Sequence, residues 1–358
     1  MRRRSYLRVL STGAAAASLA GCRSLVGGPA SGDGDRTLPP VLDERPAGVY
    51  RPTHASGVRV AGIADAGEFR FALLYSYPGR FWEVVGQQTY RRSVEVDDSI
   101  HLMTLVWDPD TGLVLPEVGL TAEIRQDGDL VAREAVYAML SQRLGFHYGD
   151  NFALPGDGEY TVDISVGGLQ IRRTGAFEGR FGDPASVSIG LPYSSAERDT
   201  IPSRRPDDAG AGGALSPADI EGVPAVRPPT DVPGRHLGQR STDGARLDAR
   251  VLTGDPAARR GATGNEVYLV VRSRTPHSGL LLPAMGLEAA IERDGERRFE
   301  GTLSRTMDAE LGYHYGASVP PLTERDQLTV EVLSPPQVAR HEGYETAFME
   351  MPPVSWTG

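Results

Sequence analysis

The stretch Leu144-Gly145-Phe146-His147-Tyr148-Gly149 returns as Leu311-Gly312-Tyr313-His314-Tyr315-Gly316, 167 residues further along the chain. The same spacing separates Leu113-Val114-Leu115-Pro116 from Leu280-Leu281-Leu282-Pro283. Because independent landmarks share one register, the chain is a tandem duplication.

Each copy alternates apolar and polar side chains with a period of two, which is typical of half-buried strands. The clearest examples are Phe69, Phe71, Leu73 and Tyr75, then Tyr160, Val162, Ile164 and Val166, and Leu328, Val330 and Val332. Asp127-Gly128 and Asp294-Gly295 lie between such runs, as hairpin turns do. The pattern predicts an all-β protein of two tandem immunoglobulin-like β-sandwich domains.

Composition predicts where these domains begin and end. Segments rich in Gly, Pro and Asp have too little apolar content to fold alone, so we expect them to be a tether and a linker. The predicted parts are a signal at 1–22, a disordered tether at 23–54, a first sandwich at 55–193, a Pro/Gly-rich linker at 194–233 and a second sandwich at 234–358.

The chain has 358 residues, a formal net charge of −10 and no lysine, so its 37 basic residues are all arginine. An acidic surface of this kind indicates a salt-loving source such as a halophilic archaeon. It speaks against nucleic-acid binding, which requires a basic stripe. The 43 glycines and 27 prolines argue against a helical bundle.

The N-terminus is typical of an export signal. Arg3-Arg4-Ser5-Tyr6-Leu7 indicates the twin-arginine route, and a short apolar stretch then ends in Leu19-Ala20-Gly21-Cys22. The latter resembles a lipobox, and Cys22 is the only cysteine, so no internal disulfide forms. We therefore expect a lipid on Cys22 that anchors the protein to the outer face of the cell membrane.

Motifs for enzymatic chemistry are missing from the sequence. There is no Gly-x-Ser-x-Gly elbow, no P-loop and no dinucleotide fingerprint. His341-Glu342 begins like a zinc-protease motif, but position 345 is glutamate instead of histidine. We expect the protein not to be an enzyme.

Histidine and methionine side chains favour a metal site instead. His147 and His314 lie in the repeated Gly-x-His-Tyr-Gly frame, with Met139 and Met307 upstream of them. Imidazole with thioether suits copper better than magnesium or calcium. The alternative is structural, because methionine commonly fills cores and a histidine in a turn can bond the backbone.

A third ligand differs between the copies. The second copy offers His341, whose counterpart in the first is Thr174. The first copy offers His101, whose counterpart in the second is Tyr268. The two copies have therefore lost different ligands.

These motifs resemble the Fe2+ transport family of periplasmic metal-binding proteins. In the second copy Met307, His314-Tyr315-Gly316 and Arg340-His341 match the family's methionine, first motif histidine and late histidine. In the first copy His101-Leu102 matches the early histidine, with Met103 where the family has glutamate.

The first copy departs from the family pattern at two further positions. Leu140 occupies the place aligned with the family methionine, so Met139 is one residue out of register, and Thr174 replaces the late histidine.

The resemblance implies small, usually dimeric sandwiches that act in iron uptake and bind copper or a related ion through His and Met near the dimer interface. Two fused copies would then pack as an intrachain pseudo-dimer. One composite site would combine His101 or His147 with Met307, His314 and His341; the alternative is two separate sites, one of them degenerate.

The sequence thus predicts an exported, lipid-anchored protein that holds a copper or iron ion and acts in uptake or handling of these metals at the cell surface. Its partners would be the membrane and a permease or redox protein, and Tyr148 and Tyr315 would orient the histidines. Two alternatives remain: a surface adhesion or scaffold module without a metal, in which the tyrosines tie loops to the sheet, and an electron-transfer or reductase-like role.

Overall fold

The computed structural model describes residues 40–358, which belong to one compact unit. The predicted twin-arginine signal and Cys22, the predicted lipidation site, lie outside the described residues. Within these residues no helix combines the length and apolar character that a membrane crossing requires.

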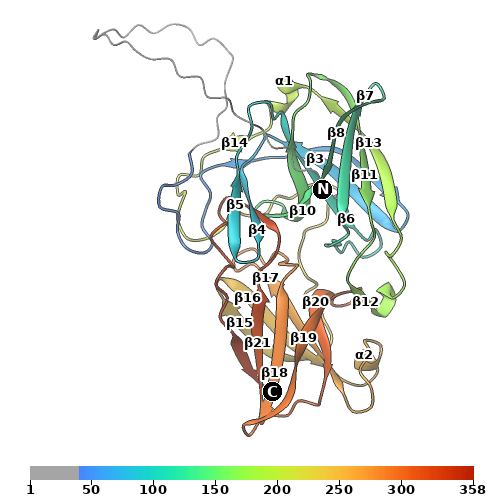
Figure 1. Ribbon diagram of the computed structural model, residues 1–358, viewed down its shortest axis with the longest axis vertical. Coiled ribbons are helices and arrows are strands. Elements are labelled where there is room, and N and C mark those ends of the chain that lie inside the picture. Colours follow the sequence, from blue (N-terminus) through green and yellow to red (C-terminus); the bar gives the residue numbers. More distant parts are fainter. Residues whose placement is uncertain (1–39) are drawn as a thin grey trace, which may run out of the picture. The chain divides into compact units, whose positions relative to one another are not determined.

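Strands make up nearly all of the regular secondary structure in the described chain and are arranged as tandem sandwiches, which confirms the predicted all-β class (Figure 1). The first half contains an eight-stranded sheet. In spatial order its strands are β2 (Arg59–Ala66), β3 (Phe69–Ser76), β6 (Ile100–Trp107), β10 (Gly145–Phe152), β9 (Tyr137–Ser141), β22 (Ala339–His341), β4 (Phe81–Val85) and β5 (Gln88–Arg92).

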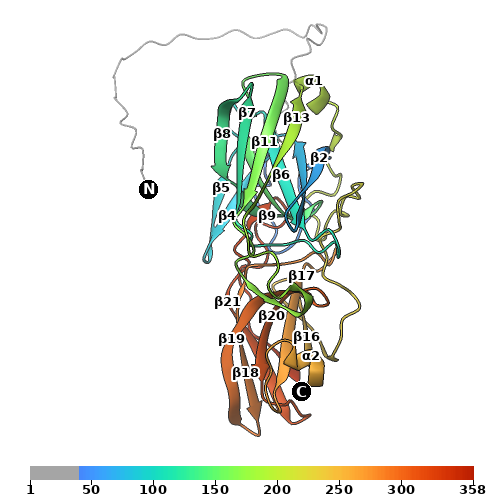
Figure 2. The same cartoon turned by 90° about the vertical axis from the view of Figure 1, so that its right-hand side faces the viewer.

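A second, four-stranded sheet completes the first sandwich, and Figure 2 shows its strands side by side. They are β13 (Ala185–Tyr193), β11 (Gly158–Val166), β7 (Leu120–Gln126) and β8 (Asp129–Ala135). Burial along β11 alternates from residue to residue, so one face of this sheet meets the core and the other meets solvent.

The second half repeats this plan around one long strand, β19 (Glu296–Asp308). Its first part pairs with β18 and its last part with β20, so β19 belongs to both layers. The remaining strands are β15 (Arg235–Thr242), β16 (Ala245–Leu252), β17 (Val267–Arg274), β18 (Gly286–Arg293), β20 (Gly312–Val319), β21 (Asp326–Ser334) and β23 (Val354–Thr357).

The two halves exchange a short strand. β22 comes from the second half of the chain but lies in the first sandwich, where it pairs parallel to β9 and antiparallel to β4. Reciprocally, β12 (Arg172–Thr174) leaves the first half and pairs parallel to β19, as its position beside the orange strands in Figure 1 shows. The pairs Ala339–Met139 and Arg172–Thr306 are related by the 167-residue offset, so the exchange obeys the repeat.

Residues 40–54 of the predicted tether, together with the predicted linker, cover a face of the eight-stranded sheet. Tyr50 is fully buried and bridges to Gly212, and β1 (Ala55–Ser56) pairs with β14 (Ser203–Arg204). Gln142 accepts a hydrogen bond from the backbone of Leu215. With both faces covered, all eight residues of β6 are buried.

Helices are short in the described residues: α1 (Ser195–Arg198), α2 (Gly254–Ala258) and one 3-10 turn, η1 (Gly175–Phe177). The main hydrophobic core runs through both sandwiches and includes side chains such as Phe71, Ile164, Leu247 and Tyr315. The fold therefore places the histidine-bearing strands β6, β10 and β22 side by side or nearly so in one covered sheet.

Candidate metal centre

Three histidines converge on one covered face of the first sandwich. His101 lies on β6, His147 on β10 and His341 on the exchanged strand β22. Each offers a ring nitrogen, and the three nitrogens lie within 4.8 Å of one another. Bonds of about 2.0 Å to one ion bring such nitrogens closer still, which requires side-chain movements of about 1 Å.

The rings are packed against one another. The centroid of the His341 ring lies 5.1 Å from that of His101, nearly perpendicular to it, and 5.4 Å from that of His147, nearly parallel to it. His101 and His147 are buried, whereas His341 is partly exposed with a buried Nε2. The cluster is thus reached from the side of His341.

Hydrogen bonds fix the tautomer of His101. Asn151 accepts at Oδ1 from the Gly79 backbone N–H (3.0 Å) and donates from Nδ2 to the Gly79 carbonyl (2.9 Å), which settles the orientation of its amide. The Nδ1 of His101 is 2.9 Å from this same Oδ1, so Nδ1 must carry the proton and donate it. The lone pair is left on Nε2, which is buried and has no hydrogen-bond partner.

His147 is oriented by its own turn. Its Nδ1 donates to the Gly145 carbonyl at 2.9 Å, since a carbonyl can only accept. Gly145 has a φ of +77°, a conformation that favours glycine and explains this residue at the head of the motif. The Nε2 of His147 is likewise buried without a partner and carries the lone pair.

Burial keeps the imidazoles neutral. Loss of solvation lowers the pKa of His101 to about 4 and that of His147 to about 3, and it also lowers the pKa of His341. The neighbouring histidines lower the pKa of His147 and His341 further, because each would repel a second positive charge. Neutral imidazole is the form that binds metals.

The thioether of Met139 lies beside the imidazoles, and the lack of a side chain at Gly149 keeps the space between them open. Met139 on β9 is directly opposite His147, and therefore on the same face of the sheet. A methyl group at Gly149 would lie 3.2 Å from Nε2 of His101 and 3.4 Å from Sδ of Met139. Gly149 thus leaves open the space that these two donor atoms border.

The cluster opens into a cavity of about 110 Å³. Besides the three histidines its walls include Met103, His54, Arg80 and Glu342. Burial opposes ionisation of Glu342, but bonds from His54, Thr53 and Arg80 outweigh it and lower its pKa to about 2. Arg80 donates to this carboxylate at 2.9 Å, so the two charges offset each other.

The second half contains a counterpart of this cluster in which no imidazole nitrogen is free. His314 donates from Nδ1 to the Gly312 carbonyl, as His147 does to Gly145, but its Nε2 accepts from the Tyr268 hydroxyl at 3.1 Å. Thr306 is opposite His314 where Met139 is opposite His147. Thr174 occupies the place of His341 and donates to Asp308 at 2.8 Å.

The structure therefore brings together four of the six predicted ligands: His101, His147, His341 and Met139. His314 lies in the counterpart cluster of the second half. Met307 is opposite Tyr313, on the other face of the sheet, and its side chain belongs to the main core.

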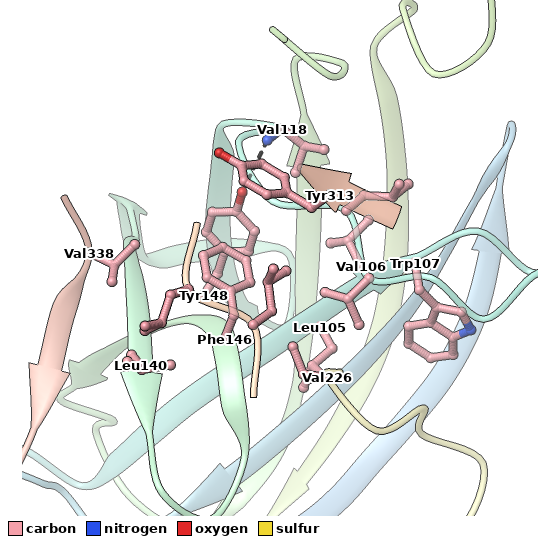
Figure 3. Packing of buried hydrophobic residues seen from close by; sticks show 14 of the residues in the cluster. Leu105, Val106, Trp107, Val118, Leu140, Phe146, Tyr148, Val226, Tyr313 and Val338 are labelled. Atoms are coloured by element: carbon pink, nitrogen blue, oxygen red, sulfur yellow. Dashed lines mark hydrogen bonds between the residues drawn. The ribbon is translucent and has the colours of Figure 1, made fainter. Parts of the chain in front are cut away.

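The tyrosines of the repeated motif do not contact the histidines, because neighbouring residues of a strand point to opposite faces. The Tyr148 hydroxyl accepts from the backbone N–H of Val118 at 3.0 Å (Figure 3), and Tyr315 accepts from Met285 in the same way. Sequence reasoning assigned the orienting role to these tyrosines and missed Asn151, although Asn151 follows the first motif by only two residues.

Comparisons with known proteins give a family model and a fold likeness. Residues 230–357 match a family model described as a domain of unknown function (DUF7350). No curated protein matches the chain.

Among solved structures the chain is similar to a copper-bound variant of FetP from uropathogenic Escherichia coli strain F11. The identity is 19%, the match covers 38% of this chain and 97% of the other, and the TM-score is 0.30. FetP of the same strain in its as-isolated form is 16% identical over 39% of this chain and 96% of the other, with a TM-score of 0.29.

Proposed function

We propose that this chain is a non-enzymatic copper-binding protein whose ion is held by His101, His147, His341 and Met139. The observation that carries the proposal is the convergence of three imidazoles, each with a ring nitrogen within 4.8 Å of the others and each with a buried Nε2 that has no hydrogen-bond partner in the protein.

Buried imidazole nitrogens without a protein partner are energetically unfavourable. Each buried polar atom without a partner costs about 1–3 kcal/mol. Two of the Nε2 atoms present lone pairs whose direction is fixed by bonds at Nδ1. A cation at their meeting point satisfies all of the nitrogens at once, and the neutral rings need to lose no proton to accept it.

The donor set favours copper over iron. Three imidazoles and one thioether are borderline-to-soft ligands, whereas iron in a site without thiolate normally takes at least one carboxylate. Glu342 is the carboxylate in the cavity wall, and its charge is already offset by Arg80.

The place of action follows from the N-terminal sequence. The twin-arginine motif and Cys22 in its lipobox-like frame support export and a lipid anchor. We infer that the protein collects or handles copper, in the service of copper or iron uptake, at the outer face of the cell membrane, where a permease or redox protein would receive the ion.

The scaffold alternative is favoured only for the second half. There His314 is buried, its two nitrogens are both bonded, and its partner Tyr268 is not a metal ligand in this geometry. We infer that the second sandwich supports the site by donating β22 and does not hold an ion itself.

The test is a copper titration of the purified protein lacking its signal, with His341→Gln and His277→Gln compared. His277 is exposed and lies outside the cluster. We expect one ion per chain in the wild type and in His277→Gln, and loss of tight binding in His341→Gln. Wild-type stoichiometry and affinity in His341→Gln would overturn the proposal.

A further inference from the structure

Met103 is a second thioether at the same cavity, and the function proposed above does not use it. It follows His101 by two residues on β6, so the two side chains share a face of the sheet. It is directly opposite Gly149, the residue whose missing side chain opens the space beside Nε2 of His101 and Sδ of Met139. Its side chain lines the cavity and is 5% exposed.

The groups around the cavity supply no net negative charge, because Arg143 in its wall adds a positive charge that no carboxylate of the wall offsets. The imidazoles and thioethers are neutral donors, and the one carboxylate of the wall is paired with Arg80 at 2.9 Å. A bound ion therefore keeps its full charge in a buried place. The cost of burying an ion rises with the square of its charge, so a monovalent ion is favoured over a divalent one.

The softness of the donors points the same way, since thioether sulfur selects Cu(I) among the available copper and iron ions. We propose that the cavity holds copper in the cuprous state and that Met103 is the residue that selects this state. This inference rests on the proposed function, because it presupposes that the histidine cluster binds copper.

The counterpart position supports a dedicated use of Met103. Val270 is its equivalent in the second half and belongs to a small apolar cluster with Tyr268 and Leu252. In the second half, where Nε2 of His314 is already bonded to Tyr268, valine therefore stands in place of the methionine.

The experiment measures the affinities for Cu(I) and Cu(II) separately, under nitrogen, by competition with bicinchoninate for Cu(I) and with glycine for Cu(II). The variants are Met103→Leu and, as a matched control, Met307→Leu, a buried core methionine of the second half. Methionine-to-leucine exchanges conserve volume and are well tolerated in cores. X-ray absorption of the Cu(I)-loaded proteins counts the sulfur ligands.

We expect the wild type to bind Cu(I) more tightly than Cu(II). Met103→Leu should lower the Cu(I) affinity by at least about 10-fold, the smallest loss expected even for a group that only supports a ligand, change the Cu(II) affinity far less, and reduce the number of sulfur ligands from two to one. Met307→Leu should change neither affinity.

Preference of the wild type for Cu(II), or equal losses for both ions in Met103→Leu, would overturn the assignment of Met103 while leaving the copper site in place. Absence of binding to either ion would instead overturn the proposed function itself.

Discussion

The two histidine clusters began from the same repeated sequence and differ in what faces the imidazole. Nε2 of His147 is buried without a partner, among two further histidines and a thioether, whereas Nε2 of His314 accepts from Tyr268. In both halves the glycine carbonyl two residues earlier fixes the ring in the same way. The comparison shows that the repeated motif specifies the orientation of the histidine ring. The side chains on the neighbouring strands decide whether its Nε2 atom is left without a hydrogen-bond partner.

The largest difference is expected from removing each histidine in turn. His147→Gln should lower copper affinity by more than about 100-fold, because it removes a proposed ligand itself. Loss of a group that only bonds to a ligand typically costs about 10–100-fold. His314→Gln should leave stoichiometry and affinity unchanged, because this nitrogen is already bonded to Tyr268. Copper titration of both variants measures these affinities. An equal loss of copper affinity in His147→Gln and His314→Gln would contradict the distinction between the two clusters.

A smaller effect is expected from the group that orients His101. Asn151→Ala removes the acceptor at Nδ1 and should lower copper affinity by about 10–100-fold. Ser318 is its counterpart by the repeat and is opposite Tyr268. Ser318→Ala is therefore the matched control and should bind copper like the wild type, as a competition assay would show.

The tyrosines of the two motifs should behave alike. Tyr148→Phe and Tyr315→Phe each leave a backbone N–H without its acceptor, at Val118 and Met285 respectively. Each should lower the free energy of unfolding by about 1–3 kcal/mol and leave copper affinity unchanged. Urea unfolding measures the former, and a loss of copper binding in Tyr148→Phe alone would contradict the structural role.

The pH dependence of the free energy of unfolding tests whether His314 is buried and neutral in the second half. Burial lowers the pKa of His314 to about 4, while an unfolded histidine titrates near 6.5. The unfolded chain therefore takes up a proton first, and the contribution of His314 is fully present above pH 6.5 and is lost as the pH falls toward 4.

One such histidine contributes a slope of about 1.4 kcal/mol per pH unit within that window. We expect urea unfolding of the metal-free protein at pH 7, 6 and 5 to show a free energy of unfolding that falls as the pH is lowered. In His314→Gln the slope of this fall should be smaller by about 1.4 kcal/mol per pH unit, the contribution of one histidine. An unchanged slope would mean that His314 is protonated in the folded chain or solvated within it.

The fold was predictable because the sequence patterns that specify it extend over many residues. The 167-residue repeat and the alternation along segments such as 160–166 and 328–332 extend over enough residues to specify strands and sandwiches. The exchange of β12 and β22 was not, since each has three residues and no period can be read from so few.

The candidate site was predictable in its residue types and not in its register. The spacing of the family motif pointed to Met307, but a hairpin in which Gly145 is opposite Ser141 places Met139 opposite His147. In the second half the same geometry puts Thr306 opposite His314 and turns Met307 to the core. A shift of one residue moves a side chain to the other face of a sheet, which spacing along the sequence does not reveal.

The position of His341 on β22 makes assembly of the centre depend on both halves of the chain. The strand that carries it pairs with partners some 200 and 260 residues earlier in the chain, at Met139 and Phe81. A nascent polypeptide must therefore be synthesised beyond His341 before the three imidazoles can come together. A protease that cuts between the halves would leave His341 on a different fragment from His101 and His147, so the cluster would then depend on the two fragments staying paired through β22.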